Sequence, residues 1–332
     1  MIKSKIRTHV PFLDKILGGQ FCPGTHGVIV PTGIGKSHLA MMIAINAATH
    51  GDSLGRNAQK SKPWVLINMD MPLDDMQDRI ASHAAQIKRS DVLINSDGQT
   101  TPEQQRCLKK RDQVVAVVNG QLSHCGREGW YEFANGRPSL NDLENKLNTC
   151  LLKASKERGL GGIVIDDALG VYQVFDGRNP CEIEDHEFLS LLAGTWCRRW
   201  AKKYQCPVWI MHSASGDAGG ASPLARLHHR NALYCKTFAD KLDVCLVVGT
   251  RCIESEVFGI QCTKTIGKPL VDKIVPLIYD PNDVATIIEA EGYTEDPLEQ
   301  TWTAPTDPAL LATPCVSTHL AELKAKLKHR GK

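Results

Sequence analysis

An apolar strand pattern, a glycine-containing loop and an apolar helix pattern follow one another between residues 28 and 48. The loop is Pro31-Thr-Gly-Ile-Gly-Lys-Ser37, in which Gly33 and Gly35 let backbone N–H groups close around an anion. The N-terminus of the helix that follows adds positive potential at the same place. The alternative is an ordinary glycine turn, but the strand before it and the helix after it favour a phosphate site.

Two side chains at the end of this loop add the chemistry of nucleotide binding. Lys36 is placed to reach the outer phosphates of a nucleotide, and the Ser37 hydroxyl is placed to bind Mg²⁺. The loop departs from the G-x-x-x-x-G-K-[ST] pattern, since Val30 stands at its first position. The residues that we expect to hold the nucleotide are Thr32, Gly33, Ile34, Gly35, Lys36, Ser37 and His38.

Composition excludes several classes of protein. The chain has 332 residues and a formal charge of +2, so one large α/β domain with appendages is expected and no polyanionic partner is required. No run of eighteen apolar residues occurs, which argues against a membrane span. The first residues lack the apolar core of a secretory signal, so we expect a cytoplasmic protein.

Strand and helix patterns alternate along the chain, which predicts a mostly parallel twisted sheet flanked by helices. The last strand patterns follow one another without helices between them, and they predict an antiparallel meander at the C-terminal end of the sheet. After the phosphate loop, the expected strands are residues 64–69, 161–167, 207–211, 243–248, 257–262 and 273–279.

Acidic residues end two of the expected strands. Asp166 follows a buried strand, and at the carboxyl edge of a parallel sheet it is placed to hold Mg²⁺ and its water shell. Asp70 ends the strand 64–69 and is placed to orient or deprotonate an attacking water. The alternative for both acids is the capping of the next turn or helix.

The expected domain organisation has three parts. Residues 1–292 form the ATPase-type α/β domain, with a poorly patterned insertion at about 90–130 in which residues 104–118 are predicted to be helical. Residues 293–316 contain several prolines and are predicted to be a linker. Residues 317–332 form a basic helix with a leucine stripe, which is predicted to dock on a protein surface, with phosphate binding as the alternative.

The order of these patterns resembles the RecA/DnaB superfamily of ATPases, and most of all the DnaB-type helicases. Thr8-His-Val-Pro-Phe-Leu-Asp-Lys-Ile-Leu-Gly-Gly19 resembles the lead-in that these proteins place before the phosphate loop. The segment from Leu66 to Arg79 resembles the DnaB-type S-L-E-M-P…R segment, which implies that Asp70 is the catalytic base. The resemblance implies a RecA-like fold, ATP and Mg²⁺ as ligands, and a phage or mobile-element origin.

The same resemblance implies roles for residues late in the chain. His212 stands at the position of the γ-phosphate sensor, although a satisfied histidine at the end of a strand is the alternative. A Lys-x-Arg finger of the helicases reaches the γ-phosphate of a neighbouring subunit in a ring or filament. Lys264-Thr-Ile266 keeps only the lysine of that finger, and the other candidates for the contact in trans are Lys268 and Arg251.

A glycine-rich basic loop follows the expected sensor. In RecA-like rings the equivalent loop lines the channel and grips the phosphates of single-stranded DNA, and cations there give sequence-independent binding. A solvated surface loop is the alternative. The residues predicted to contact DNA are Arg226, His228, His229 and Arg230.

The sequence thus predicts an ATP-dependent motor that forms a homo-oligomer and moves on single-stranded DNA, most similar to a DnaB-type helicase core. A RecA/RadA-like strand-exchange or loading protein is the second hypothesis. A KaiC-like regulatory ATPase, which binds protein partners instead of DNA, is the third.

Overall fold

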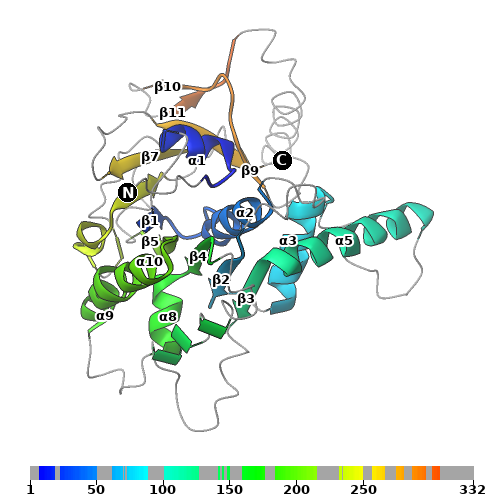
Figure 1. Cartoon of the computed structure of the whole chain (residues 1–332). Helices are drawn as coiled ribbons and strands as arrows, with labels where there is room; N and C mark the ends of the chain where they lie inside the picture. The colour runs from blue at the N-terminus through cyan, green and yellow to red at the C-terminus, as the bar shows by residue number, and fades with distance from the viewer. Residues whose placement is uncertain are drawn as a thin grey trace.

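The computed structural model places the strands and helices of an α/β domain (Figure 1). Within the part of the chain that it describes, no helix is both long and apolar enough to cross a membrane. The described residues are 7–18, 23–50, 62–69, 71, 73–88, 101–126, 141–142, 144–145, 148–149, 159–175, 184–214, 232–233, 235–249, 256–265, 274–279, 286–296 and 301–306.

A nine-stranded sheet forms the centre of the described structure, with the strand order β3-β2-β4-β5-β1-β6-β7-β8-β9. Neighbouring strands from β3 to β6 are parallel, and those from β6 to β9 are antiparallel. This arrangement confirms the predicted α/β fold with a C-terminal meander. The strands are β1 (Gly24–Val30), β2 (Trp64–Asn68), β3 (Leu122–Gly126), β4 (Gly162–Asp166), β5 (Pro207–Ser213), β6 (Val244–Val248), β7 (Phe258–Lys264), β8 (Val275–Tyr279) and β9 (Ile287–Glu289).

Side chains alternate between the two faces of the parallel strands and so build two separate cores. On β1, Val28 and Val30 join the core that contains α2 (Lys36–Thr49), while Ile29 joins the core on the opposite face. On β4, Val164 lies on the α2 face, and its neighbours in sequence lie on the other. Because both faces are covered, these strands are apolar along their whole length, as the sequence indicated.

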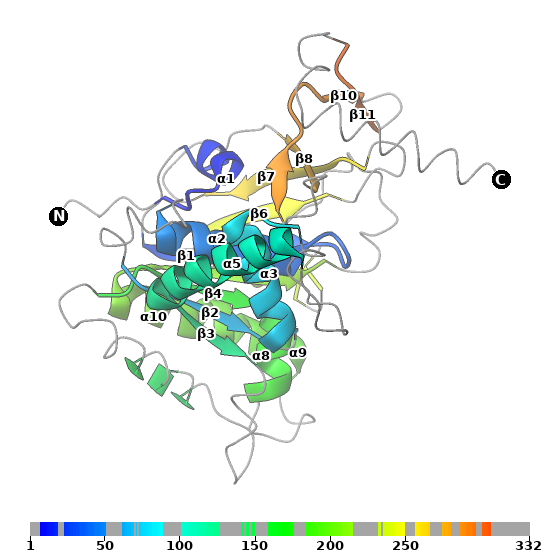
Figure 2. The ribbon, with the colours of Figure 1, turned by 90° about the vertical axis from the view of Figure 1, so that its right-hand side faces the viewer.

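Each face of the sheet carries its own set of helices (Figures 1 and 2). On the first face, α2 packs on β2, β4 and β5 and also contacts α3 (Leu73–Ala85) and α5 (Pro102–Gln121). The opposite face carries α8 (Ala168–Phe175), α9 (Asp185–Leu191), the π-helical turn η2 (Leu192–Cys197) and α10 (Arg198–Tyr204). Two short elements complete the described helices, α1 (Pro11–Ile16) and the 3₁₀ turn η5 (Phe238–Lys241).

The expected insertion at 90–130 contains an edge of the sheet. The predicted helix at 104–118 is confirmed as part of α5, which a capping box at Thr101 and Gln104 starts, with side chain and backbone bonded in both directions. The strand β3 then pairs in parallel with β2. Residues 101–126 are therefore a helical crossover and an edge strand of the same sheet.

The C-terminal end of the described chain packs on the meander (Figure 2). A hairpin of β10 (Thr294–Asp296) and β11 (Thr301–Thr303) follows the nine-stranded sheet. Trp302 and Tyr293 are buried in a small core with Val257 and Ile278. The predicted boundary at residue 292 therefore lies inside a packed region, while the basic helix predicted for 317–332 lies outside the described residues.

Candidate nucleotide site

A cavity of about 260 Å³ lies where β1 ends and α2 begins. Its size is close to the lower end of the range of small-molecule sites, roughly 300 Å³. Six of the seven predicted loop residues line it, the exception being Ile34. The other lining residues, from elements far apart in the sequence, are Pro31, Met71, Arg79, Ser213 and Tyr279.

The phosphate loop depends on two glycines in the left-handed region. Gly33 has φ +83°, and Gly35, which caps α2, has φ +79°. A β-carbon at Gly33 would have no atom within 4 Å, so its side of the loop is open. A β-carbon at Gly35 would lie 2.0 Å from the Tyr279 hydroxyl, so only glycine fits against that side chain. The loop thus combines an open face with the positive end of α2.

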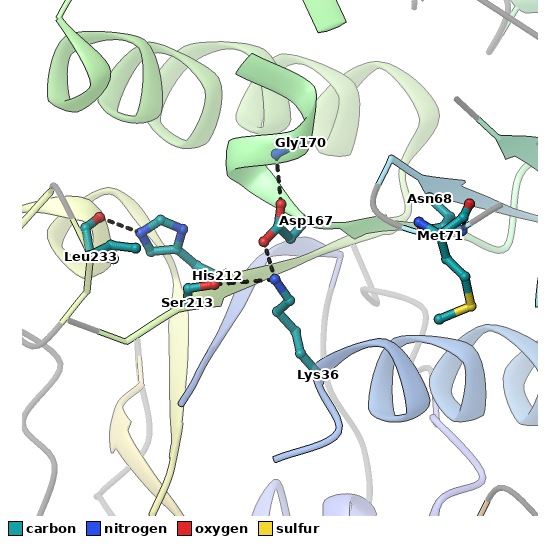
Figure 3. A network of polar contacts seen from close by, with 8 residues as sticks. All are labelled: Lys36, Asn68, Met71, Asp167, Gly170, His212, Ser213 and Leu233. Carbon is teal, nitrogen blue, oxygen red and sulfur yellow. Dashed lines mark hydrogen bonds and ion pairs between the residues drawn. The ribbon is translucent and has the colours of Figure 1, made fainter. Parts of the chain in front are cut away.

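Lys36 extends from the first turn of α2 to the ends of two strands on the sheet (Figure 3). Its ammonium group forms an ion pair with Asp167 and donates a hydrogen bond to the Ser213 hydroxyl at 3.2 Å. The other carboxylate oxygen of Asp167 accepts a hydrogen bond from the Gly170 N–H, at 2.7 Å, in the first turn of α8. These contacts connect the phosphate loop with β5 and the exit of β4.

Adjacent acids end β4 in different surroundings. Asp166 is the last residue of the strand and is fully buried. The alternation along β4 puts it on the same face as Val164, toward α2, as the predicted Mg²⁺ role requires. Asp167 has left the strand and contacts Lys36 directly. A carboxylate on the α2 face and the Ser37 hydroxyl are oxygen donors of the kind that Mg²⁺ prefers, and Mg²⁺ usually keeps several waters besides such ligands.

His212 and Ser213 point to opposite faces at the end of β5 (Figure 3). Ser213 is on the α2 face and lines the cavity, whereas the His212 ring packs against Phe238, with ring centroids 4.6 Å apart. The ring nitrogen Nε2 lies 2.7 Å from the Leu233 carbonyl oxygen. Burial lowers the pKa of His212 to about 4, so the ring is neutral at pH 7. The contact with a phosphate that the sequence predicts for His212 is therefore available to Ser213 in this arrangement.

The turn after β2 also reaches the cavity. The Asn68 side chain closes it, accepting a hydrogen bond from the Met71 N–H at 3.3 Å and donating one to the Met71 carbonyl at 3.1 Å (Figure 3). Met71 lines the cavity, while Asp70, the predicted base, lies outside the described residues. Arg79 lies beside the His38 ring, with Nη1 3.3 Å from Nε2. The segment that resembles the DnaB-type pattern thus borders the site.

The ends of the glycine-rich basic loop lie next to the same cavity. Ala214 and Ala232 form an antiparallel bridge, and the Leu233 N–H donates to the Ser213 carbonyl at 2.9 Å. The predicted DNA contacts, at residues 226, 228, 229 and 230, lie outside the described residues. Their loop leaves and re-enters the fold within hydrogen-bonding distance of the strand that carries Ser213.

One of the three finger candidates lies in the described structure. Lys264 ends β7, and its ammonium group donates to the carbonyls of Ala239 and Asp240 at 2.8 and 2.9 Å. It therefore caps η5 within its own chain. Arg251 and Lys268 lie outside the described residues.

Asp167 and Tyr279 are site residues that the sequence analysis did not identify, and Ser213 was not separated from His212. For Ser213 a signal exists: Trp209, Met211 and Ser213 alternate onto the face that α2 covers. Tyr279 reaches the cavity from the meander, and no sequence pattern indicates that contact. The role of Asp167 depends on how α8 leaves the sheet, which an Asp-Asp pair does not specify.

The fold is that of RecA/DnaB-type P-loop ATPase domains. The chain is similar to the ATPase domain of a DnaB-like helicase, with a TM-score of 0.65 and 11% identity over 85% of this chain and 90% of that one. It is also similar to a DnaB-like replicative helicase whose structure was solved to study its interactions with primase. That match has a TM-score of 0.61 and 12% identity over 82% of this chain and 61% of the helicase. A KaiC-like protein, PH0186 from Pyrococcus horikoshii OT3, gives a TM-score of 0.54 and 11% identity over 86% of this chain and 99% of that one. No protein-family model and no curated protein matches the sequence.

Proposed function

We propose that the chain hydrolyses ATP and uses the energy to move along single-stranded DNA, as a DnaB-type motor. The observation that carries this proposal is the position of Lys36, which extends from a glycine loop to the ends of β4 and β5. In P-loop ATPases a lysine at this place contacts the outer phosphates. The likeness to two DnaB-like helicase structures supports this choice among P-loop ATPases.

In this proposal each wall of the cavity has one task. The N–H groups at the start of α2 and the Lys36 ammonium bind the phosphates, and Ser213 contacts the terminal one. Ser37 and Asp166 hold Mg²⁺, which supplies neutralisation of the charge that develops on the phosphates. Asp70 orients the attacking water, and His212 keeps the end of β5 in place through the Leu233 carbonyl.

The loop between Ala214 and Ala232 is proposed to hold the DNA strand. Its two ends adjoin Ser213, so a change at the terminal phosphate is transmitted to the loop through the end of β5. The proposed cations and donors are Arg226, His228, His229 and Arg230. Binding through phosphates is independent of sequence and weakens steeply with salt.

A homo-oligomer, a hexameric ring or a filament, completes the proposal. Each nucleotide would then face a lysine or arginine from the next subunit, and the candidates are Lys264, Lys268 and Arg251. The basic segment 317–332 is proposed as a contact for another protein.

The test compares the wild-type chain with Lys36→Ala. We expect ATP hydrolysis that single-stranded DNA stimulates, unwinding of a duplex with a single-stranded tail, and loss of both in the variant. Lys202→Ala, an exposed lysine on α10, is the matched control and should behave as the wild type. Turnover that persists in Lys36→Ala contradicts the whole assignment, and pairing of homologous strands without unwinding favours a recombinase.

A regulatory ATPase is the second candidate, because the likeness to the KaiC-like protein covers 99% of that chain. This candidate predicts hydrolysis that single-stranded DNA neither stimulates nor inhibits. The same ATPase assay with and without DNA therefore separates the two proposals.

A further inference from the structure

Asp167 is the partner of Lys36 in the described structure. The ammonium and the carboxylate form an ion pair, and both side chains are largely removed from water, with exposed fractions of 14% and 6%. Ser213 is a neutral neighbour of the same ammonium group, at 3.2 Å. The charge that the loop offers to a phosphate is therefore already balanced by a carboxylate.

The position of Asp167 is fixed by the helix that follows it. Its second oxygen accepts the Gly170 N–H at 2.7 Å, and the N-terminal end of α8 favours a negative charge there. The carboxylate is therefore held beside Lys36 when a nucleotide arrives. Two negative groups a few ångströms apart at a partly buried site repel each other strongly.

We propose that Asp167 makes nucleotide binding in this cavity dependent on Mg²⁺. The inference rests on the proposed nucleotide site. A nucleotide without metal brings its phosphate charges next to Asp167 and must also compete with it for Lys36. A nucleotide with Mg²⁺ brings a compensating charge to the same place, between Asp166 and the phosphates. Asp167 thus acts as a positioning residue for Lys36 that admits the metal-bound nucleotide and disfavours the free one.

A purely structural role predicts something different. If Asp167 only starts α8, its replacement disturbs the end of β4 and weakens nucleotide binding equally with and without metal. If Asp167 acts through its charge, neutralising it strengthens binding in the absence of metal. The two roles therefore differ in the ratio of two dissociation constants.

The experiment measures binding of a fluorescent ADP analogue to the wild type and to Asp167→Asn, once with Mg²⁺ and once with EDTA. The asparagine oxygen can still accept the Gly170 N–H, so the cap is kept while the charge is removed. We expect the ratio of the dissociation constant in EDTA to that in Mg²⁺ to fall by about tenfold or more, mainly through tighter binding in EDTA. Asp112→Asn removes an exposed charge of the same sign on α5 and should leave the ratio unchanged.

Further variants keep the test decisive. Asp167→Glu keeps the charge and should keep the metal dependence, and Asp167→Ser, a good helix cap, replaces Asp167→Asn if the latter does not fold. An unchanged ratio in the neutral variants, or equal weakening in both conditions, overturns the inference while the nucleotide site stands. A wild-type chain that binds no ADP in either condition overturns the proposed function and the inference with it.

Discussion

The imidazole of His212 is joined to the carbonyl of Leu233, with 2.7 Å between Nε2 and the oxygen. His212 belongs to the strand that carries Ser213 into the nucleotide cavity, and Leu233 lies where the chain returns from the glycine-rich loop. One hydrogen bond therefore connects the strand beside the phosphate site with the end of the loop that we propose for DNA. Because the ring is buried, this bond forms with neutral histidine at pH 7.

The first prediction concerns pH. Burial lowers the pKa of His212 to about 4 in the fold, while the unfolded chain has the ordinary value of 6.5. Below pH 6.5 the unfolded chain binds a proton that the folded chain does not, so stability is present above this pH and is lost as the pH falls toward 4. The loss between pH 7 and 5 is about 2 kcal/mol. Urea unfolding at both pH values should show this loss in the wild type and a smaller one in His212→Gln; equal losses would mean that His212 titrates normally.

His83 provides an independent second case. It is buried between α2, α3 and the start of β9, with Nδ1 2.8 Å from the Thr286 hydroxyl and Nε2 3.4 Å from the Asn46 amide. Burial first, and the nearby His38 second, lower its pKa to about 4. Stability is again lost as the pH falls below 6.5, so His83→Gln should also flatten the pH dependence by about 2 kcal/mol between pH 7 and 5. The double variant should show the sum of both effects, because His83 and His212 lie in different cores.

The two loop glycines should respond differently to alanine. Both have positive φ, and alanine there carries a backbone penalty of roughly 1 kcal/mol. Gly35→Ala adds a clash, since the new β-carbon would lie 2.0 Å from the Tyr279 hydroxyl, whereas Gly33→Ala meets no atom within 4 Å. We expect Gly35→Ala to lose more nucleotide affinity, measured by titration with the fluorescent ADP analogue. Combining each variant with Tyr279→Ala should remove the difference; a difference that persists would assign it to the loop backbone alone.

The parallel core could be predicted because its strands are apolar on both faces. β1, β2, β4, β5 and β6 each form an unbroken apolar run between turn residues, and that pattern does not depend on the rest of the fold. β3 was not predicted, since the edge strand Leu-Ser-His-Cys-Gly has neither an apolar run nor a clear alternation. The β10–β11 hairpin was placed in a linker, because its prolines and polar residues conceal the burial of Trp302 and Tyr293.

The candidate site was predictable where residues are local in sequence. Gly33, Gly35, Lys36 and Ser37 belong to one loop, and their grouping needs no tertiary information. The partner of Lys36 is different, because Asp167 is 131 positions away and its approach depends on how β4 passes into α8. Pattern analysis finds that an acid ends the strand, but it does not find which of two adjacent acids contacts the lysine.

The extent of the folded domain can be tested at Trp302. This side chain is 4% exposed and packs with Val257, Ile278 and Tyr293 on the meander. Replacing a buried tryptophan with alanine destabilises a protein by about 3–5 kcal/mol. Thermal or urea unfolding of Trp302→Ala should show such a loss, and Thr303→Ala, an exposed neighbour on β11, should show almost none. Equal stability of both variants would return residues 293–306 to the role of a linker.

The last prediction asks whether Lys264 acts within its own chain or on a neighbour. Within the chain it caps η5 through two carbonyls, so Lys264→Ala as a mere cap variant should lose about 1–2 kcal/mol of stability and hydrolyse ATP normally. As a finger, Lys264 must leave these carbonyls when subunits assemble, and its loss should reduce turnover by roughly 10³-fold with little change in nucleotide binding.

Mixing variants separates these outcomes. In an oligomer of Lys264→Ala and Lys36→Ala chains, some interfaces combine an intact Lys36 with an intact Lys264, so part of the activity should return if Lys264 acts in trans. Lys202→Ala, mixed with Lys36→Ala in the same proportion, gives the activity expected from simple dilution. If the Lys264→Ala chain is inactive and mixing restores nothing, Lys264 is required within its own subunit. If that chain is fully active, the contact in trans falls to Lys268 or Arg251.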